Sequence, residues 1–329
     1  MLLSELVATS ATVAATRSRK AKVAAIAACL EAAGPAELEV TVSYLGGALR
    51  QRRTGLGWRS LTQLPGPADE PSLTVMQVDA AFAEMATLAG PGSQLARAAA
   101  VGSLFGRATA AEQQWLRGVV TGEVRQGALD SLVQEALAVA AGVPLTAVRR
   151  AAMLAGSTPA VAARAFQGEQ ALAEVGLVVG RPVLPMLASS APTLADALAK
   201  VGGAAAVDTK LDGIRIQVHR RGDEVIIATR TLEDITARLT EVADVVRRLP
   251  ADPLVLDGEA MTVDADGRPR PFQETASRTA TRGGRGCTSR RTSSTSSMPT
   301  AATCSIFRSR TGWPSWTGSC RPSCGCHGW

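Results

Sequence analysis

The sequence has few aromatic side chains, no long apolar run and, over most of its length, almost no cysteine. Phe, Trp and Tyr make up 3% of the 329 residues. No stretch of about eighteen or more apolar residues is free of charge, which excludes a membrane-spanning helix. The opening residues lack a basic start followed by a long apolar stretch, so they do not match a secretory signal. We therefore expect a cytoplasmic protein with no membrane partner.

Charge and cysteine content both change abruptly near residue 279. Residues 279–329 hold seven Arg and no Lys, Asp or Glu, which leaves 28 basic against 29 acidic residues before them. Cys29 stands alone among residues 1–278, whereas five cysteines follow: Cys287, Cys304, Cys320, Cys324 and Cys326. The net charge of +6 therefore comes from the last segment, and the near-neutral main body does not by itself indicate a nucleic-acid partner.

The length predicts two ordered domains, each large enough to bury a sizeable apolar core. Residues 1–176 show helical periodicity, as in "KVAAIAACLEAA" and "LDSLVQEALAVAAG". Pro and Gly interrupt it at "PGPADEPS", "AGPGS" and "AGVP", and Thr109 with Glu112 predicts a capping box before "AAEQQWLRGVV". We predict an all-α domain over residues 1–176.

A change of pattern marks the second domain. Three prolines in "VGRPVLPMLASSAPT" predict an extended linker over residues 177–192. After it, "GAAAVDTKLDG", "IRIQVHRRGDEVIIATR" and "LVLDGEAMTV" alternate apolar with polar residues and are rich in β-branched ones, with "RRGDE" as a hairpin turn. The stretch "EDITARLTEVADVVRRL" is typical of one amphipathic helix between strands. We predict a largely antiparallel α+β domain over residues 193–278.

The residues that indicate chemistry lie in "VDTKLDGIR". Lys210 lies between two predicted strands, with Asp208 and Asp212 on either side and Arg215 five residues on. Taken alone, a lysine at a strand edge among acidic neighbours is more often a solvated surface charge. However, "ATRTLEDIT" and "LVLDGEAM" follow it in order. Together the three motifs resemble those of the covalent nucleotidyltransferases, and of ATP-dependent DNA ligases in particular.

This resemblance implies a reaction. The family motif K-x-D-G-x-R is matched by Lys210, Asp212, Gly213 and Arg215. Its lysine attacks the α-phosphate of ATP, forms lysyl-AMP and releases pyrophosphate. The amine must first lose its proton, and cationic neighbours, bound metal or desolvation can lower its reference pKa of ~10.4. Phosphoryl transfer then needs mainly positioning and charge neutralisation.

The same resemblance makes residues 193–278 an incomplete, ATP-grasp-like adenylation domain. It implies that Arg215 and Arg230 contact the ribose or, later, the nick phosphate, and that Glu259 binds the ribose hydroxyls. Asp208 occupies the place where many relatives carry Glu near the adenine. ATP and Mg²⁺ are the implied cofactors, and we assign no metal-ligating residue of this chain.

The helical domain resembles the DNA-binding domain that precedes the catalytic core in one branch of the family. The matching stretches are "QRRTGLGWRSL" and "VVTGEVRQGALDSLVQEALA", and the later phrase "RPVLPMLA" is also typical of the family. Helices that meet at Gly-containing turns can bring backbone N–H groups and Arg side chains close to phosphates. Arg52, Arg53 and Arg125 are therefore our candidates for DNA contact, although any single arginine is more often a plain surface charge.

The resemblance as a whole implies a monomeric DNA ligase that seals nicks in duplex DNA during replication, repair or recombination. One alternative is a non-catalytic, DNA-binding remnant built on the helical domain. Another is a different nucleotidyltransferase, such as an RNA ligase or an mRNA-capping enzyme. The helical domain before Lys210 argues against the latter.

Residues 279–329 do not continue the ligase pattern. Nineteen of these 51 residues are Ser or Thr, and no helix or strand period remains. A zinc site of Cys320, Cys324, Cys326 and His327 is an alternative, but the spacing C-x3-C-x-C-H closes no familiar structural site. A segment of this composition buries too little apolar surface to offset its ordering entropy. We predict a disordered tail.

A shifted reading frame accounts for the charge, cysteine and serine of the tail together. We take Ser to be encoded by TCN and Arg by CGN. When the last base of each codon is read together with the first two bases of the next codon, one permitted peptide from Gly286 is "VHLTPYFFDVLDADGRDLLDLP". From Gly312 the same reading permits "LAVLDRIVP". The first string resembles the next ligase motif, whose Phe stacks on adenine. We expect a frame change near Arg278. The chain would then lack that Phe, the later Glu and Lys motifs and the OB-fold domain. We therefore expect little or no nick sealing.

Overall fold

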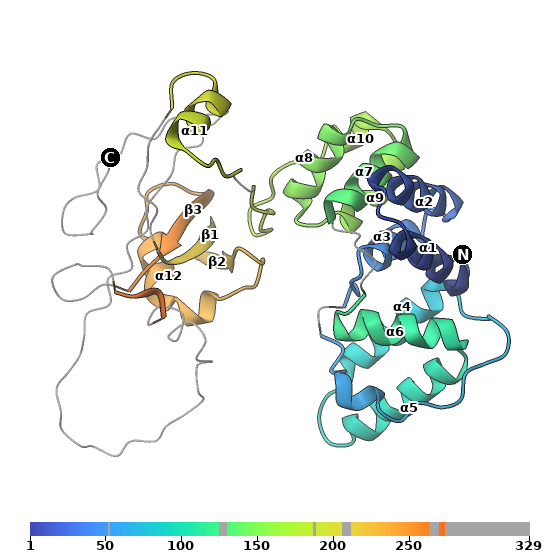
Figure 1. Ribbon diagram of the computed structural model, residues 1–329. Coiled ribbons are helices and arrows are strands. Elements are labelled where there is room, and N and C mark those ends of the chain that lie inside the picture. Colours follow the sequence, from blue (N-terminus) through green and yellow to red (C-terminus); the bar gives the residue numbers. More distant parts are fainter. Residues whose placement is uncertain (52, 125–129, 187–188, 206–211, 263–269, 274–329) are drawn as a thin grey trace, which may run out of the picture. The chain divides into compact units, whose positions relative to one another are not determined.

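The chain forms two compact units, Met1–Gly176 and Leu177–Trp329, which are described separately (Figure 1). The computed structural model describes residues 1–51, 53–124, 130–186, 189–205, 212–262 and 270–273. Arg52, Arg125, Asp208 and Lys210 lie outside these residues, as does the predicted tail over 279–329. None of the described helices is long and apolar enough to cross a membrane.

The first unit is helical over its described residues, apart from one isolated β-bridge between Leu2 and Thr74. The prediction of a helical front part is thereby confirmed. Its longer helices are α1 (Leu3–Ala15), α2 (Arg19–Ala32), α3 (Leu38–Leu45), α4 (Val75–Thr87), α5 (Ser93–Gly106), α6 (Ala110–Thr121), α7 (Asp130–Ala141) and α8 (Leu145–Ala155). Its shorter ones are η1 (Trp58–Leu61), η2 (Pro159–Val161), α9 (Ala162–Phe166) and α10 (Glu169–Ala173).

One apolar core holds these helices together. Helix α2 packs along α7 and against α1, and Ala27 of α2 and Ala136 of α7 are both buried in the core. The large side chains of Tyr44, Phe82 and Phe105 are fully buried, and the ring of Tyr44 lies 5.4 Å from that of Trp115. Burial of such side chains is the main favourable term for the unit.

The predicted capping box before α6 is present. Thr109 Oγ1 accepts from the backbone N–H of Glu112 at 3.4 Å, and Glu112 Oε2 accepts from the backbone N–H of Thr109 at 2.8 Å. Two N–H groups at the start of the helix are thereby satisfied. At the predicted break "AGVP", Gly142 has φ +64°, a conformation that glycine adopts without strain.

The second unit contains a three-stranded antiparallel sheet of order β2-β1-β3, as expected for a largely antiparallel α+β domain. The strands are β1 (Ile214–Arg221), β2 (Glu224–Thr229) and β3 (Leu254–Ala260), and the helices are α11 (Leu194–Val201), η3 (Thr236–Arg238) and α12 (Thr240–Arg247). The predicted hairpin turn is confirmed, because Arg221 pairs with Glu224 and Gly222 has φ +59°.

The sheet has one apolar and one polar face. Ile216 and Val218 of β1 point to the core formed with Val242 and Val246 of α12. Because side chains alternate along a strand, Arg215, Gln217 and His219 of β1 and Asp257 and Glu259 of β3 lie on the opposite face. The polar face therefore carries Arg215 and Glu259, two of the predicted site residues.

The prediction of one helix over residues 233–249 is wrong in its first half. Helix α12 begins at Thr240, and the stretch before it forms an isolated bridge between Ala228 and Asp234 and then the turn η3. Asp234 Oδ1 accepts from the backbone N–H of Thr236 at 2.9 Å, and Thr236 Oγ1 accepts from the N–H of Ile227. Side chains that bond nearby backbone groups compete with a helix in this way.

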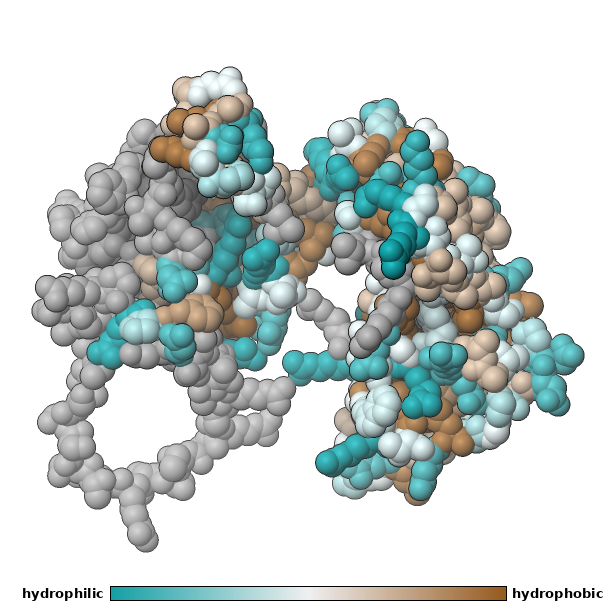
Figure 2. All heavy atoms as spheres, in the orientation of Figure 1, coloured by the Kyte–Doolittle hydropathy of each residue, from teal (hydrophilic) through white to brown (hydrophobic). Residues whose placement is uncertain are grey.

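Part of the stretch 177–192, which we expected to be a linker, bonds to the sheet of the second unit. Of the expected strand over residues 203–213, only residues 203–205, 212 and 213 are described, and none of these is in a strand. On the face drawn in Figure 2, hydrophilic residues intermingle with small hydrophobic groups over both units. No residue of α11 is buried.

Candidate functional site

The described residues of the predicted site that belong to the K-x-D-G-x-R and "DGE" motifs lie at the end of the sheet where β1 begins. Asp212 and Gly213 lead into β1, and both Asp212 and Arg215 are exposed. In the register of the sheet, Arg215 pairs with Glu259 of β3. The described part of the K-x-D-G-x-R motif and the "DGE" motif are therefore neighbours in space. Lys210 and Asp208 belong to the same stretch of sequence but lie outside the described residues.

Gly213 is required by close packing. A Cβ atom at this position would lie 2.5 Å from the backbone oxygen of Ala260 and 2.8 Å from Cγ of Glu259. No other side chain fits without moving the backbone of β3. The N–H of Gly213 donates to Glu259 Oε1 at 3.2 Å, so the glycine of one motif helps to hold the glutamate of the other.

Arg215 forms a two-pronged ion pair with Asp257. Its Nε and Nη2 atoms donate to Asp257 Oδ1 at 3.1 Å and Oδ2 at 2.6 Å. These bonds raise the pKa of Arg215 above its ordinary value, so the guanidinium stays charged. Nearly half of each side chain is exposed, which leaves the pair open to solvent and to an anionic ligand.

Arg230 lies at the same end of the sheet. Thr229 pairs with Ile216 of β1, so Arg230 follows one residue beyond the last pair, next to the row of Arg215 and Glu259. Its side chain is exposed. Arg215 and Glu259 thus lie on one face of the central strand and of one edge strand, and Arg230 follows the other edge strand at the same end of the sheet.

Further along the polar face, a segment before α11 covers β1. Gln217 donates from Nε2 to the backbone oxygen of Val183 at 2.6 Å and accepts at Oε1 from its N–H at 3.0 Å. His219 accepts at Nδ1 from the N–H of Gly180 at 3.2 Å and is 1% exposed. Burial lowers the pKa of His219, which favours the neutral ring.

Sequence reasoning missed Asp257, Gln217 and His219. A signal was available, because residues two and four positions after Arg215 share its face of a strand. Asp257 lies two residues before Glu259 and shares its face for the same reason. What no pattern showed is that the covering segment at Gly180–Val183 supplies the partners of Gln217 and His219.

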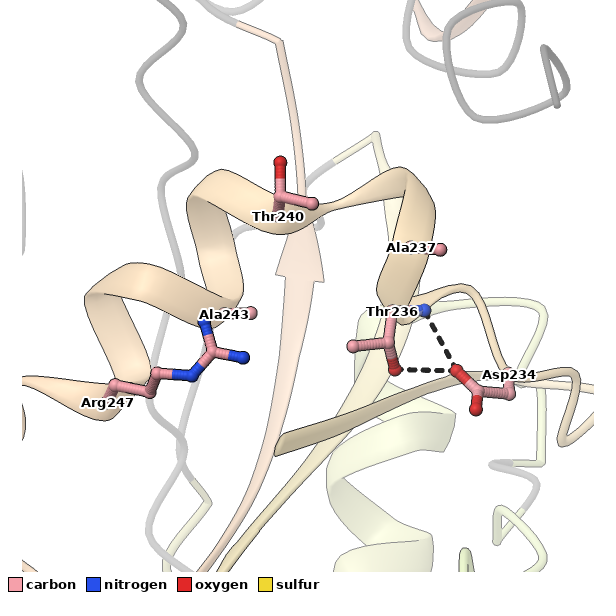
Figure 3. Close-up of a pocket in the computed structure, with 6 residues that line it drawn as sticks. All are labelled: Asp234, Thr236, Ala237, Thr240, Ala243 and Arg247. Atoms are coloured by element: carbon pink, nitrogen blue, oxygen red, sulfur yellow. Dashed lines mark hydrogen bonds between the residues drawn. The ribbon is translucent and has the colours of Figure 1, made fainter. Parts of the chain in front are cut away.

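A cavity of about 430 Å³ lies elsewhere in the second unit, beside η3 and α12 (Figure 3). Its lining is Asp234, Thr236, Ala237, Thr240, Ala243 and Arg247. Asp234 is held by Thr236, and Arg247 donates to Asp244 at 2.7 Å. Asp234 and Thr236 belong to the motif "ATRTLEDIT", but none of the residues predicted to bind the nucleotide lines this cavity, so we assign it no part in the predicted chemistry.

Of the arginines expected to contact DNA, Arg53 is described and is exposed, whereas Arg52 and Arg125 lie outside the described residues. The neighbouring Arg50 has a structural role. Its Nε donates to Asp79 Oδ1 at 3.0 Å, and Gln51 Nε2 donates to the same oxygen at 3.0 Å. Burial opposes the ionised form of Asp79, but these donors outweigh it and hold the pKa of Asp79 below its ordinary value.

Two family models match the chain in the order in which the two units occur. Residues 60–138 match the model described as "DNA ligase N terminus", and residues 185–303 match "ATP dependent DNA ligase domain". The chain belongs to the ATP-dependent DNA ligase family. The second match includes every residue of the expected nucleotide site. It also reaches residue 303, inside the segment 279–329, so the boundary of the expected out-of-frame tail stays a prediction.

Curated relatives of the ligase chain are bacterial proteins named "Probable DNA ligase". The chain is 71% identical over 286 residues to the one from Nocardioides sp., which covers 85% of this chain and 56% of that relative. It is 64% identical over 284 residues to the one from Kineococcus radiotolerans and 62% identical over 291 residues to the one from Beutenbergia cavernae. The ligase chain thus spans little more than half the length of these relatives.

A solved structure named Pmar-Lig_PreS3 resembles the ligase chain in fold. The TM-score is 0.50 at 16% sequence identity, with 92% of this chain and 56% of that chain covered. At this identity the likeness concerns the fold alone. It is consistent with a helical unit followed by a unit that contains an antiparallel sheet.

Proposed function

We propose that this chain takes part in ATP-dependent sealing of nicks in duplex DNA, with Lys210 as the residue that becomes adenylated. The observation that carries the proposal is the match of residues 185–303 to the ATP-dependent ligase domain, since it includes Lys210, Arg215, Arg230 and Glu259. The helical unit and its own ligase match favour DNA over the RNA-ligase and capping-enzyme alternatives.

The proposed reaction begins with the neutral amine of Lys210. Its lone pair attacks the α-phosphorus of ATP, the P–N bond of lysyl-AMP forms, and the bond to pyrophosphate breaks. AMP then passes to the 5′-phosphate of the nick, and attack by the 3′-hydroxyl closes the strand and releases AMP. Each step is a displacement at phosphorus, so cations placed around the phosphate stabilise the negative charge that develops there.

We propose that Glu259 accepts hydrogen bonds from the ribose hydroxyls and that Arg215 and Arg230 contact ribose or phosphate. Glu259 is already oriented by the N–H of Gly213, which fixes one of its oxygens. Asp208 and Asp212 flank Lys210 in sequence and complete the proposed nucleotide site. Asp257 has a supporting part in this proposal, because it keeps the guanidinium of Arg215 on the polar face.

The proposal includes Mg²⁺ as a companion of ATP. Among the described residues, no group of three or more His, Cys, Asp or Glu side chains could hold a metal ion. These residues therefore do not fit a preformed magnesium site. Mg²⁺ commonly binds through phosphate oxygens and water rather than through an all-protein cage, so we propose that it arrives with the triphosphate.

For the helical unit we propose binding of duplex DNA, chiefly through phosphates, with Arg52, Arg53 and Arg125 as contacts. Such binding weakens with added salt because condensed counterions are released. We further propose a monomer, as the family resemblance implies, and we keep the expectation that it acts in the cytoplasm. Size-exclusion chromatography with light scattering tests the monomer, and salt titration of DNA binding tests the phosphate contacts.

The lysine assignment is tested with the reading frame restored after Arg278. The protein is incubated with radiolabelled ATP and Mg²⁺, and covalent label that is released by acid is counted, as befits a P–N bond. We expect label in the parent and in the control Lys20→Ala, which alters an exposed lysine of α2. We expect none in Lys210→Ala. Undiminished label in that variant would overturn the assignment.

We also propose that the 329-residue chain seals nicks poorly or not at all. The second candidate function, a non-catalytic DNA-binding protein, is favoured by the separate core of the unit Met1–Gly176. A nicked, labelled duplex measures binding and sealing by the same chain. The chain is assayed for binding without ATP and for sealing with ATP, with the frame-restored protein as positive control. Robust sealing by the 329-residue form contradicts the proposal, and binding without sealing supports the second candidate.

A further inference from the structure

Two stretches of the helical unit that are far apart in sequence meet at one surface. The loop after α3 contains "QRRTGLGW", and the end of α6 leads into "TGEV". Val124, the last residue of "TGEV", packs against the start of the loop after α3, because a Cβ on Gly47 would lie 3.5 Å from its Cβ. The small Gly47 lets these segments approach, so residues from both share one surface.

Trp58 is the unusual residue of this surface. It begins η1 and is 59% exposed, although tryptophan is among the side chains that gain most from burial. The guanidinium carbon of Arg117, on α6, lies over its ring at 5.5 Å from the ring centre. An exposed cation–π contact of this kind contributes little to stability. A contribution to stability therefore does not explain why Trp58 and Arg117 are paired at the surface.

The loop that carries Trp58 is anchored at several points. Arg97 of α5 donates to the backbone oxygens of Thr54 at 3.2 Å and of Leu88 at 2.6 Å. Its guanidinium packs on Gly55, where a Cβ would lie 2.8 Å from it. Leu61, at the end of η1, is 2% exposed and pins the loop to the core. Because both sides of Trp58 are fixed, its exposure is a property of the fold.

We propose that Trp58 and Arg117 form one contact site for the sugar–phosphate backbone of duplex DNA. The guanidinium of Arg117 neutralises a phosphate, while the indole of Trp58 packs on the apolar side of an adjacent deoxyribose. Arg53 and Arg59 lie on the same loop and are exposed, so the surface carries further positive charge. A phosphate backbone next to apolar sugar matches this combination of cation and aromatic ring. The inference rests on the proposed function, since it takes DNA as the partner.

The charge of the site distinguishes DNA from an apolar protein surface as its partner. An apolar partner gains from Trp58 but gains nothing from the arginines around it, and its binding is insensitive to salt. For DNA, each phosphate contact that is lost lowers the slope of log binding constant against log salt by about one. The two side chains therefore have different signatures: Arg117 contributes to the slope, and Trp58 contributes to affinity at every salt concentration.

The test measures binding of the full 329-residue chain to a fluorescent nicked duplex without ATP, over a series of salt concentrations. We expect Trp58→Ala and Arg117→Ala each to weaken binding about tenfold at low salt. We expect Arg117→Ala alone to lower the salt slope by about one. Trp58→Phe and Arg117→Lys should keep most of the affinity. Circular dichroism and thermal unfolding verify that the exposed substitutions leave the fold intact.

Two matched controls come from the same unit. Leu95→Ala removes an apolar side chain on α5 that is 79% exposed, and Arg149→Ala removes an exposed arginine of α8. Both should bind like the parent chain. If Trp58→Ala also binds like the parent, or if Arg117→Ala weakens binding no more than Arg149→Ala, this inference is overturned while DNA binding by the unit stands. If the parent chain does not bind DNA even at low salt, the proposed DNA function fails as well.

Discussion

Arg215 and Asp257 face each other diagonally across β1 and β3, with Arg215 Nη2 2.6 Å from Asp257 Oδ2. The carboxylate thus holds a guanidinium that the family resemblance assigns to the nucleotide or the nick. Asp257 is itself adjacent to the "DGE" glutamate, so the motif supplies both a ligand-binding residue and the group that orients its neighbour. The ion pair thus links β1, where the first motif ends, to β3, which contains the last motif.

We expect this ion pair to contribute little to stability. Both side chains are nearly half exposed, and exposed pairs typically couple by about 0.2–1 kcal/mol. A double-mutant cycle of Arg215→Ala, Asp257→Asn and the double variant measures the coupling from amide hydrogen exchange of peptides in β1. The coupling should shrink in high salt because exposed charges are screened. A coupling of several kcal/mol would show that the pair is a structural element rather than an oriented binding group.

Gly213→Ala should open the sheet. The new Cβ has to displace the backbone of Ala260, which it would otherwise approach to 2.5 Å. Overpacking of this kind costs about 1–3 kcal/mol, so exchange protection in β1 and β3 should fall. Gly203→Ala is the matched control, because a Cβ there meets nothing within 4 Å. Equal protection in the two variants contradicts the packing argument.

His219 should make the second unit less stable in mild acid. Burial lowers its pKa in the folded chain below the ordinary value of 6.5, so the unfolded chain binds the proton more readily. The stabilisation that comes from the neutral, buried ring of His219 is fully present above pH 6.5. It is lost as the pH falls through the pKa of His219 in the folded chain. Exchange protection of β1, corrected for the intrinsic rate at each pH, measures this loss.

His219→Asn is the comparison variant for that experiment. Its side-chain oxygen can accept from the N–H of Gly180 as Nδ1 of His219 does, and it does not titrate. Protection of β1 should therefore be nearly flat between about pH 5 and 7 in the variant. An unchanged acid dependence would assign the effect to other groups.

Arg50→Ala should destabilise the helical unit although Arg50 itself is partly exposed. It removes two donors from Asp79, whose side chain is 5% exposed, and a buried acceptor without its partner costs about 1–3 kcal/mol. Urea unfolding followed by tryptophan fluorescence reports on this unit through the buried Trp115. Arg53→Ala is the control, since that side chain is exposed, and it should unfold like the parent.

The sequence alone determined the features that depend on local pattern. Periods of three to four residues predicted the helical unit, alternation predicted β1, β2 and β3, and Thr109 with Glu112 predicted a helix start. The order of the motifs also indicated the ligase family. These features are readable because hydrophobic period and capping chemistry act over a few neighbouring residues.

Only the tertiary structure decided which residues act together. It placed Asp257 against Arg215, bound Gln217 and His219 to the segment around Gly180, and brought Arg117 over Trp58. It also ended the expected helix over residues 233–249 in favour of a turn held by Asp234. The contacts of Arg215, Gln217, His219 and Trp58 join residues about 30 to 60 positions apart, and sequence patterns do not show them because they arise from strand register and packing between elements.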